Sequence, residues 1–256
     1  MAALAVQDLA VDFGGVAALA GVTFEVRPGT ITSLIGPNGA GKTTAFNAIT
    51  GYLRPRRGRV TFDGRPLTGL RPCDVAGRGV VRTFQKTSVF PALSVRDNVM
   101  IGLHLRGRSG LLGILAGRRA VAQEEARLAG DADGIIAFVG LDHRRDAIAS
   151  ALPYGEQRLV EVAVALAARP RLLLLDEPAA GMTGSEKDRL VELVRRVRGQ
   201  GVTIFLVEHD MRLVMGVSET VIVLNHGRVI AEGPPAAIQA HPDVIRAYLG
   251  SARAQA

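Results

Sequence analysis

A phosphate-binding loop set between an apolar strand and a helix is the feature that most constrains this chain. Residues 36–43 are Gly-Pro-Asn-Gly-Ala-Gly-Lys-Thr, which matches the pattern G-x-x-x-x-G-K-[ST]. The mostly apolar segment 31–35 predicts a strand before this pattern, and residues 42–49 predict a helix after it. The glycines let successive backbone N–H groups converge on phosphate oxygens at the helix N-terminus. We therefore predict a nucleotide-binding P-loop, a device used by kinases, GTPases, motors and transporters alike.

Individual residues of this loop have distinct expected roles. The Lys42 ammonium is expected to reach the β- and γ-phosphates, and the Thr43 hydroxyl is expected to ligate Mg²⁺. The predicted ATP-binding residues of the loop are Gly36, Pro37, Asn38, Gly39, Ala40, Gly41, Lys42, Thr43 and Thr44.

Short strand patterns and helical patterns alternate around the loop. Residues 22–26 alternate apolar and polar side chains, as in a half-buried strand. The strand pattern at 60–62 leads into Asp63-Gly64, a hairpin turn signal. Further strands are expected at 80–84, 172–175, 202–207, 221–224 and 229–230, and helical patterns at 91–152 and 156–168. We therefore predict an α/β fold with a mostly parallel, doubly wound sheet and an inserted helical lobe.

Two carboxylates and a histidine follow buried strands. Asp176 and Glu177 come directly after the apolar run 172–175, where both side chains can reach the phosphate site. Asp176 suits the Mg²⁺ shell as a hard oxygen ligand acting through water. Glu177 suits a general base that polarises the attacking water. His209 follows the strand 202–207, and only its conjunction with the other motifs favours a place beside the γ-phosphate over a structural role.

Composition excludes several classes of protein. In 256 residues with 48% hydrophobic content, no apolar stretch approaches the roughly 20 residues of a membrane-spanning helix. No basic region precedes the N-terminal apolar residues, which predicts that no signal peptide is present. Cys73 is the only cysteine, as expected in a reducing, cytoplasmic setting. The net charge of +7 comes from scattered arginines, and aromatic residues are only 4%, which argues against nucleic-acid binding.

In this order and spacing, the motifs resemble those of the ATP-binding subunits of ABC transporters along essentially the whole chain. The resemblance implies that Phe13 stacks on adenine and that Gln85 senses the γ-phosphate, ligates Mg²⁺ and meets a membrane partner. The family's LSGGQ signature aligns with residues 152–156, here Leu-Pro-Tyr-Gly-Glu. The implied catalytic residues are Glu177, His209, Gln85 and Lys42, and the signature residues acting on a second subunit's ATP are Pro153, Tyr154, Gly155 and Glu156.

The same resemblance implies a domain plan. A single ABC ATPase domain is expected to have a P-loop NTPase (RecA-like) core at residues 1–90 and 169–256, with an antiparallel β subdomain. An inserted α-helical lobe at residues 91–168 is expected to carry the signature.

Finer details resemble the branched-chain amino acid importer group. They are Arg-Thr-Phe-Gln at 82–85, Asp-Glu-Pro-Ala-Ala-Gly at 176–181, the run 223–233 and Ala-Tyr-Leu-Gly at 247–250. Relatives of this group carry urea or short amides, so the resemblance indicates the group more firmly than the solute. An exporter subunit for lipid or polysaccharide shares the catalytic motifs and is the alternative. A soluble ABC ATPase usually carries a long coiled coil or two fused halves, and this chain has neither.

Two residues depart from the family pattern. Pro153 replaces the signature serine, so a hydroxyl and an N–H are lost, although the N–H groups of Gly155 and Glu156 remain available to an anion. Thr183 stands where many members have aspartate, in the segment that links two subunits. These departures concern the coupling between the two ATP sites, and ATP binding is still expected.

The expected partners follow from the same family. ATP and Mg²⁺ are the expected cofactors, and a second ATP-binding subunit, identical or a paralogue, is expected to close on ATP. Two membrane permease subunits and, indirectly, a solute-binding protein complete the predicted assembly, with no nucleic acid. The chain is then expected to lie peripherally on the cytoplasmic face of the plasma membrane.

Overall fold

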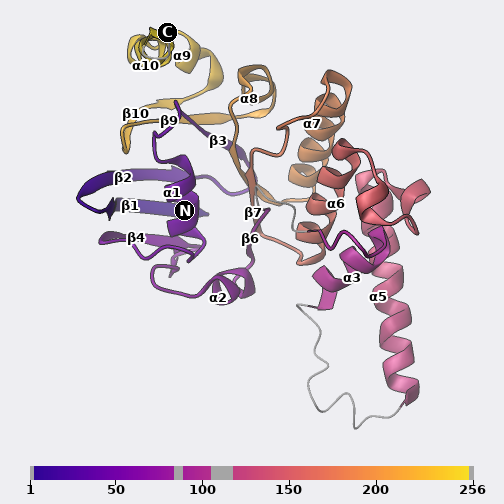
Figure 1. Ribbon diagram of the computed structural model, residues 1–256. Helices are drawn as coiled ribbons and strands as arrows, with labels where there is room; N and C mark the ends of the chain where they lie inside the picture. Colours follow the sequence, from indigo (N-terminus) through magenta and orange to yellow (C-terminus); the bar gives the residue numbers. More distant parts are fainter. Residues whose placement is uncertain (1–2, 84–88, 105–117, 254–256) are drawn as a thin grey trace. The chain divides into compact units, whose positions relative to one another are not determined.

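Two structural units make up the chain. The computed structural model describes residues 3–83, 89–104 and 118–253 (Figure 1). The first unit, referred to here as the core unit, comprises Met1–Arg82, Arg171–Ala180 and Lys187–Ala256. The second, the helical unit, comprises Thr83–Pro170 and Gly181–Glu186.

The core unit is built on a six-stranded sheet that is parallel except at one edge. Its strands are, in spatial order, β10 (Arg228–Gly233), β9 (Thr220–Asn225), β3 (Ile31–Ile35), β8 (Thr203–Val207), β7 (Leu172–Asp176) and β6 (Val80–Arg82). Only β10 runs antiparallel to its neighbour. The three central strands β3, β8 and β7 are buried at every position, as expected for a parallel sheet covered on both faces. The predicted mostly parallel sheet is confirmed.

A second, antiparallel sheet of four strands lies in the same unit. Its spatial order is β2 (Val16–Val26), β1 (Leu4–Phe13), β4 (Arg57–Phe62) and β5 (Arg65–Pro66). The hairpin between β4 and β5 turns at Asp63-Gly64, as the sequence predicts. The long strand β1 was not anticipated from the sequence pattern. Its register shifts between Val6 and Leu9, and Asp8 has a left-handed backbone, so the two-residue alternation breaks there.

The helices of the core unit cover its sheets. They are α1 (Lys42–Ile49), α2 (Pro72–Gly77), most of α7 (Gly184–Gly199), α8 (Met211–Val217), α9 (Pro235–Gln239) and α10 (Pro242–Arg253). The ring of Phe46 on α1 lies 5.1 Å from Phe205 on β8, which in turn lies 5.4 Å from Phe24 on β2. This aromatic row holds the phosphate-loop helix between the two sheets, within one apolar cluster.

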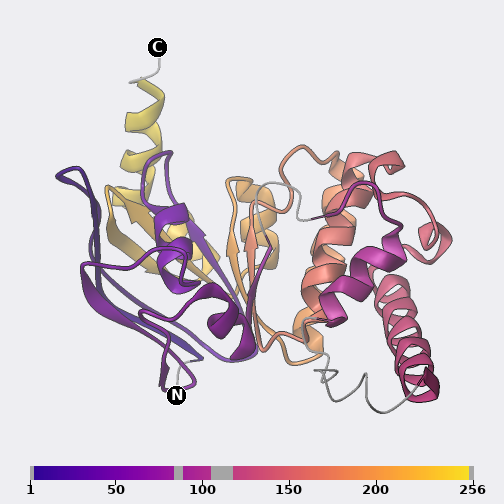
Figure 2. The ribbon, with the colours of Figure 1, turned by 60° about the horizontal axis from the view of Figure 1, so that its bottom comes forward.

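In the described part of the helical unit, three α-helices pack side by side (Figure 1; Figure 2). They are α3 (Val95–His104), α5 (Arg118–Val139) and α6 (Tyr154–Ala167). A Cβ added to Gly102 would come within 2.7 Å of the Val164 carbonyl oxygen, so the small residue lets α3 approach α6 closely. Among the described residues of the whole chain, no helix combines the length and apolar character needed to cross a bilayer.

Candidate functional site

The phosphate loop, residues 36–44, joins β3 to α1. Gly36 has φ 151°, and a Cβ there would lie 2.1 Å from the Leu224 carbonyl oxygen, so only glycine fits where the loop leaves the sheet. Gly41, with φ 103°, precedes the first helical residue, Lys42. Thr43 is exposed at the N-terminus of α1, where unpaired backbone N–H groups and the helix dipole favour an anion. The strand, loop and helix are therefore arranged as a phosphate site requires.

Lys42 lies folded over this loop. Its side-chain nitrogen Nζ donates to the Gly36 carbonyl at 2.6 Å and to the Pro37 carbonyl at 3.0 Å, and the residue is 9% exposed. Burial lowers the pKa of the Lys42 ammonium, while the negative charges of Glu177 and Asp176 oppose that shift. The structure thus brings together the lysine of the loop and the two carboxylates that follow β7.

Asp176 is the last residue of β7 and is 2% exposed. Arg82, at the end of the neighbouring strand β6, donates to its Oδ2 at 2.6 Å. Arg82 also donates to the Asn47 side chain at 2.7 Å and lies over the Phe46 ring, 5.5 Å from its centroid. The buried arginine therefore connects Asp176 to the phosphate-loop helix. The sequence pattern gave no sign of this role for Arg82, because its partners are remote in the chain.

The residues present fit a magnesium ion that arrives with a nucleotide. Among the described residues, no group of three or more histidine, cysteine or acidic side chains could hold a metal ion. Mg²⁺ typically takes one or two protein oxygens and completes its shell with water and substrate phosphates. The Thr43 hydroxyl and the Asp176 carboxylate are oxygen donors of the required type. Gln85, the third expected ligand, lies outside the described residues.

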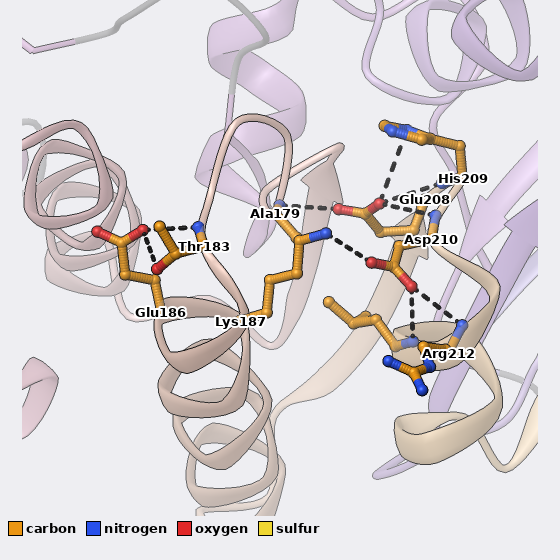
Figure 3. A network of polar contacts seen from close by, with 9 residues as sticks. Ala179, Thr183, Glu186, Lys187, Glu208, His209, Asp210 and Arg212 are labelled. Carbon is orange, nitrogen blue, oxygen red and sulfur yellow. Dashed lines mark hydrogen bonds and ion pairs between the residues drawn. The ribbon is translucent and has the colours of Figure 1, made fainter.

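Glu177 and His209 follow adjacent strands. Glu177 has a left-handed backbone, with φ 48°, and its N–H donates to the Val207 carbonyl at 2.9 Å. The backbone turns at Glu177, the expected base, and the pairing of β7 with β8 ends there. The His209 side chain is 64% exposed, which leaves the imidazole accessible (Figure 3). Both expected catalytic residues thus lie at the carboxyl edge of the sheet, where the phosphate loop also begins.

The signature segment, residues 152–156, lies in the helical unit. Pro153 is the N-cap of α6, with extended backbone, and no side chain caps the helix. Gly155 is buried, and a Cβ there would lie 2.2 Å from the Glu186 carboxylate. Glu186 accepts from the Thr183 backbone N–H at 2.7 Å and from its hydroxyl at 2.8 Å (Figure 3). The threonine that departs from the family pattern is therefore part of a capping arrangement for α7, packed beside the signature glycine.

Replacing Pro153 with serine is expected to leave ATPase activity intact or to raise it. A serine at an N-cap can accept from the first-turn N–H groups, an interaction that stabilises a helix by roughly 0.5–2 kcal/mol. It also restores the family's hydroxyl. Thermal unfolding and steady-state hydrolysis of Pro153→Ser, beside Pro153→Ala as the uncapped control, test this. A large loss of activity in a well-folded serine variant would mean that proline sets the shape of the segment.

Phe13, the residue expected to stack on adenine, is 53% exposed at the end of β1. It is not a core residue, so truncation should leave folding almost unaffected. Phe13→Ala is expected to weaken ATP binding by about 1–3 kcal/mol, the usual contribution of one stacked base. Phe13→Tyr, which keeps the ring, should retain affinity. Titration calorimetry with thermal unfolding is the measurement, and unchanged affinity in the alanine variant would contradict the stacking role.

The C-terminal helix α10 also reaches the phosphate loop. Val244 belongs to the apolar cluster that contains Ile35, the residue before Gly36, and Tyr248 packs against this cluster. Burial raises the pKa of the Tyr248 phenol, and a hydrogen bond from the Gly36 backbone opposes that rise. In the sequence, residues 247–250 indicated only the resemblance to the importer group. The structure places the tyrosine of that segment against the first glycine of the loop.

Two family profiles match separate parts of the chain. The ABC transporter family profile matches residues 19–180, and the profile of branched-chain amino acid ATP-binding cassette transporters matches residues 228–254. The chain is 42% identical to the high-affinity branched-chain amino acid transport ATP-binding protein LivG of Salmonella typhimurium, over 97% of this chain and 98% of that protein. It is 40% identical to BraF of Pseudomonas aeruginosa, with the same coverage of both chains.

The fold comparison points the same way. A crystal structure of the ADP conformation of an ATP-binding cassette of an ABC transporter superposes with a TM-score of 0.86. The two chains are 32% identical, and the match covers 98% of this chain and 99% of the other. The chain therefore belongs to the ATP-binding subunits of ABC transporters, and within them to the branched-chain amino acid group.

Proposed function

We propose that this ATPase drives the import of branched-chain or chemically related amino acids through separate membrane subunits. The observation that carries the proposal is the match of the C-terminal residues 228–254 to the branched-chain amino acid transporter profile. The catalytic motifs are common to importers and exporters, whereas this segment is particular to one group. The full-length similarity to LivG and BraF supports the same solute class over the lipid or polysaccharide exporter.

In the proposed reaction, each predicted site residue has one task. The backbone N–H groups of the phosphate loop and the Lys42 ammonium hold the phosphates of ATP. Thr43 and Asp176, together with Gln85, would hold Mg²⁺, which neutralises charge on the phosphates when bound. Glu177 accepts a proton from the attacking water, and His209 contacts the γ-phosphate. Phe13 holds the adenine ring.

A pair of ATP-binding subunits completes each site in this proposal. The signature residues Pro153, Tyr154, Gly155 and Glu156 belong to the helical unit, and we propose that they close on ATP bound to the phosphate loop of a second subunit. Two membrane permeases would carry the solute, and a solute-binding protein would deliver it. The chain would then lie on the cytoplasmic face of the plasma membrane.

An uptake experiment tests the proposal. Cells lacking the gene, complemented with the wild-type chain or with Glu177→Gln, are supplied with radiolabelled leucine, urea or acetamide. We expect the deletion to abolish high-affinity leucine uptake and the wild-type chain alone to restore it. Normal leucine uptake with loss of urea or acetamide uptake would reassign the solute. Normal uptake of all three, with accumulation of a lipid or polysaccharide precursor, would favour the exporter.

A further inference from the structure

Glu208 is a buried carboxylate directly after β8 and one residue before His209. It is 1% exposed, although nothing in the reaction described above uses it. Burying a carboxylate is costly unless several donors hold it, so the identity of its donors indicates what the residue does.

Those donors come from two segments that leave adjacent strands. One carboxylate oxygen, Oε1, accepts from the Ala179 backbone N–H at 2.8 Å (Figure 3). The other, Oε2, accepts from the backbone N–H groups of His209 at 3.1 Å and Asp210 at 3.4 Å. Ala179 lies two residues after Glu177. One side chain therefore joins the segment of the expected base to the segment of the expected histidine.

This bridge extends the connection between β7 and β8 beyond the sheet. Asp176 is paired with Val207, and the Glu177 N–H bonds to the Val207 carbonyl at 2.9 Å. The chain then turns at Glu177, where the left-handed backbone ends the regular ladder. Glu208 takes up the contact two residues later, at Ala179.

Asp210, the residue after His209, is also held in place. Asp210 caps α8 by accepting from the Arg212 and Leu213 N–H groups, at 3.0 and 3.2 Å. It also pairs with Lys187 on α7 at 2.7 Å (Figure 3). His209 is thus exposed between two fixed carboxylates, and its backbone position depends on both.

We propose that Glu208 is a positioning residue for ATP hydrolysis, because it fixes the backbone that follows Glu177 relative to the backbone of His209. The inference rests on the proposed roles of Glu177 and His209. A displacement of about 1 Å at a reacting group can lower a rate by about 100-fold. Loss of the bridge therefore slows the chemical step while the phosphate loop still binds nucleotide.

Two substitutions of Glu208 distinguish the effect of losing the contact with Ala179 from the effect of removing a buried negative charge. In Glu208→Gln, the amide NH₂ replaces one acceptor oxygen and faces a backbone N–H. In Glu208→Asp, the carboxylate keeps its negative charge but is withdrawn by one methylene group, so we expect it to lose the contact with Ala179. The matched control is Glu219→Gln. Glu219 accepts from the Ile31 N–H at 3.3 Å and pairs with Arg198 at 3.1 Å, at the opposite, amino ends of β9 and β3.

The measurements are single-turnover hydrolysis, Mg-ADP affinity and amide hydrogen exchange over residues 177–183 and 206–213. We expect both Glu208 variants to hydrolyse ATP about 10- to 100-fold more slowly with unchanged Mg-ADP affinity. Faster exchange is expected at Ala179 in Glu208→Asp, and Glu219→Gln should behave as wild type. If Glu208→Gln does not fold, Glu208→Asp alone decides the question.

Wild-type hydrolysis or wild-type exchange at Ala179 in Glu208→Asp would overturn the inference, as would an equal loss in Glu219→Gln. Glu177→Gln, measured in parallel, shows whether the assignment of the site or only the positioning role of Glu208 is wrong. If Glu177→Gln hydrolyses normally, the assignment of the site itself is wrong. If it is inactive while the Glu208 variants are fully active, only the positioning role is wrong.

Discussion

Glu177→Gln is expected to slow ATP hydrolysis by roughly 10²–10⁴, the usual contribution of a positioned general base. The amide keeps the shape of the side chain but cannot accept the proton of the attacking water. Mg-ATP should still bind, because the phosphate loop and Asp176 are unchanged. ATP would then persist between two subunits, so the variant should also form a dimer that requires Mg-ATP.

Single-turnover hydrolysis and size measurement by light scattering, with and without Mg-ATP, test both parts. Glu192→Gln on the exposed face of α7 is the control for losing one carboxylate from the core unit. Near-normal hydrolysis by Glu177→Gln would remove the residue from the catalytic role. Lost hydrolysis without a dimer would retain the base and contradict a mechanism based on two identical subunits.

Lys42→Ala is expected to reduce ATP binding and hydrolysis to near background. The lysine supplies the positive charge beside two carboxylates, and its Nζ is bonded to the carbonyl groups of Gly36 and Pro37. Alanine removes both the phosphate ligand and the internal bonds of the loop. The loss therefore has an electrostatic and a conformational cause.

Lys42→Arg and Arg65→Ala complete this experiment. Lys42→Arg keeps the charge but places a larger head group in the loop, so weak binding in both Lys42 variants would show that ammonium geometry matters. Arg65, exposed on β5 in the antiparallel sheet, is the control for the loss of one cation. Unchanged nucleotide affinity and turnover in Lys42→Ala would contradict the assignment of the loop.

Local patterns were sufficient to predict the parallel sheet and the elements that frame the phosphate loop. Residues 172–175 are an uninterrupted apolar run, and residues 31–35 and 203–207 are mostly apolar, as a doubly covered parallel strand requires. The loop itself depends on glycine at fixed spacing, which is visible in the sequence. The carboxylates Asp176 and Glu177 were predictable because they follow one of these strands directly.

Contacts between distant segments were not predictable in the same way. Arg82 contacts Asp176, and Glu208 contacts Ala179, because the sheet places strands side by side that are far apart in the chain. Strand β1 was missed because its bulge at Asp8 interrupts the alternation on which a strand prediction depends. Glu208 is visible in the sequence beside the expected histidine. Its burial, however, cannot be read from the sequence, and only burial distinguishes it from a solvated acid.

The packing of α10 against Ile35 makes nucleotide binding and the folding of the last helix linked equilibria. Tyr248 bonds to the Gly36 backbone, and the carbonyl of that same glycine accepts from Lys42. Ordering the loop around phosphates therefore favours a docked helix, and by thermodynamic reciprocity a docked helix favours a loop ready for phosphates. We therefore expect this last helix to influence nucleotide affinity, although it holds none of the catalytic side chains.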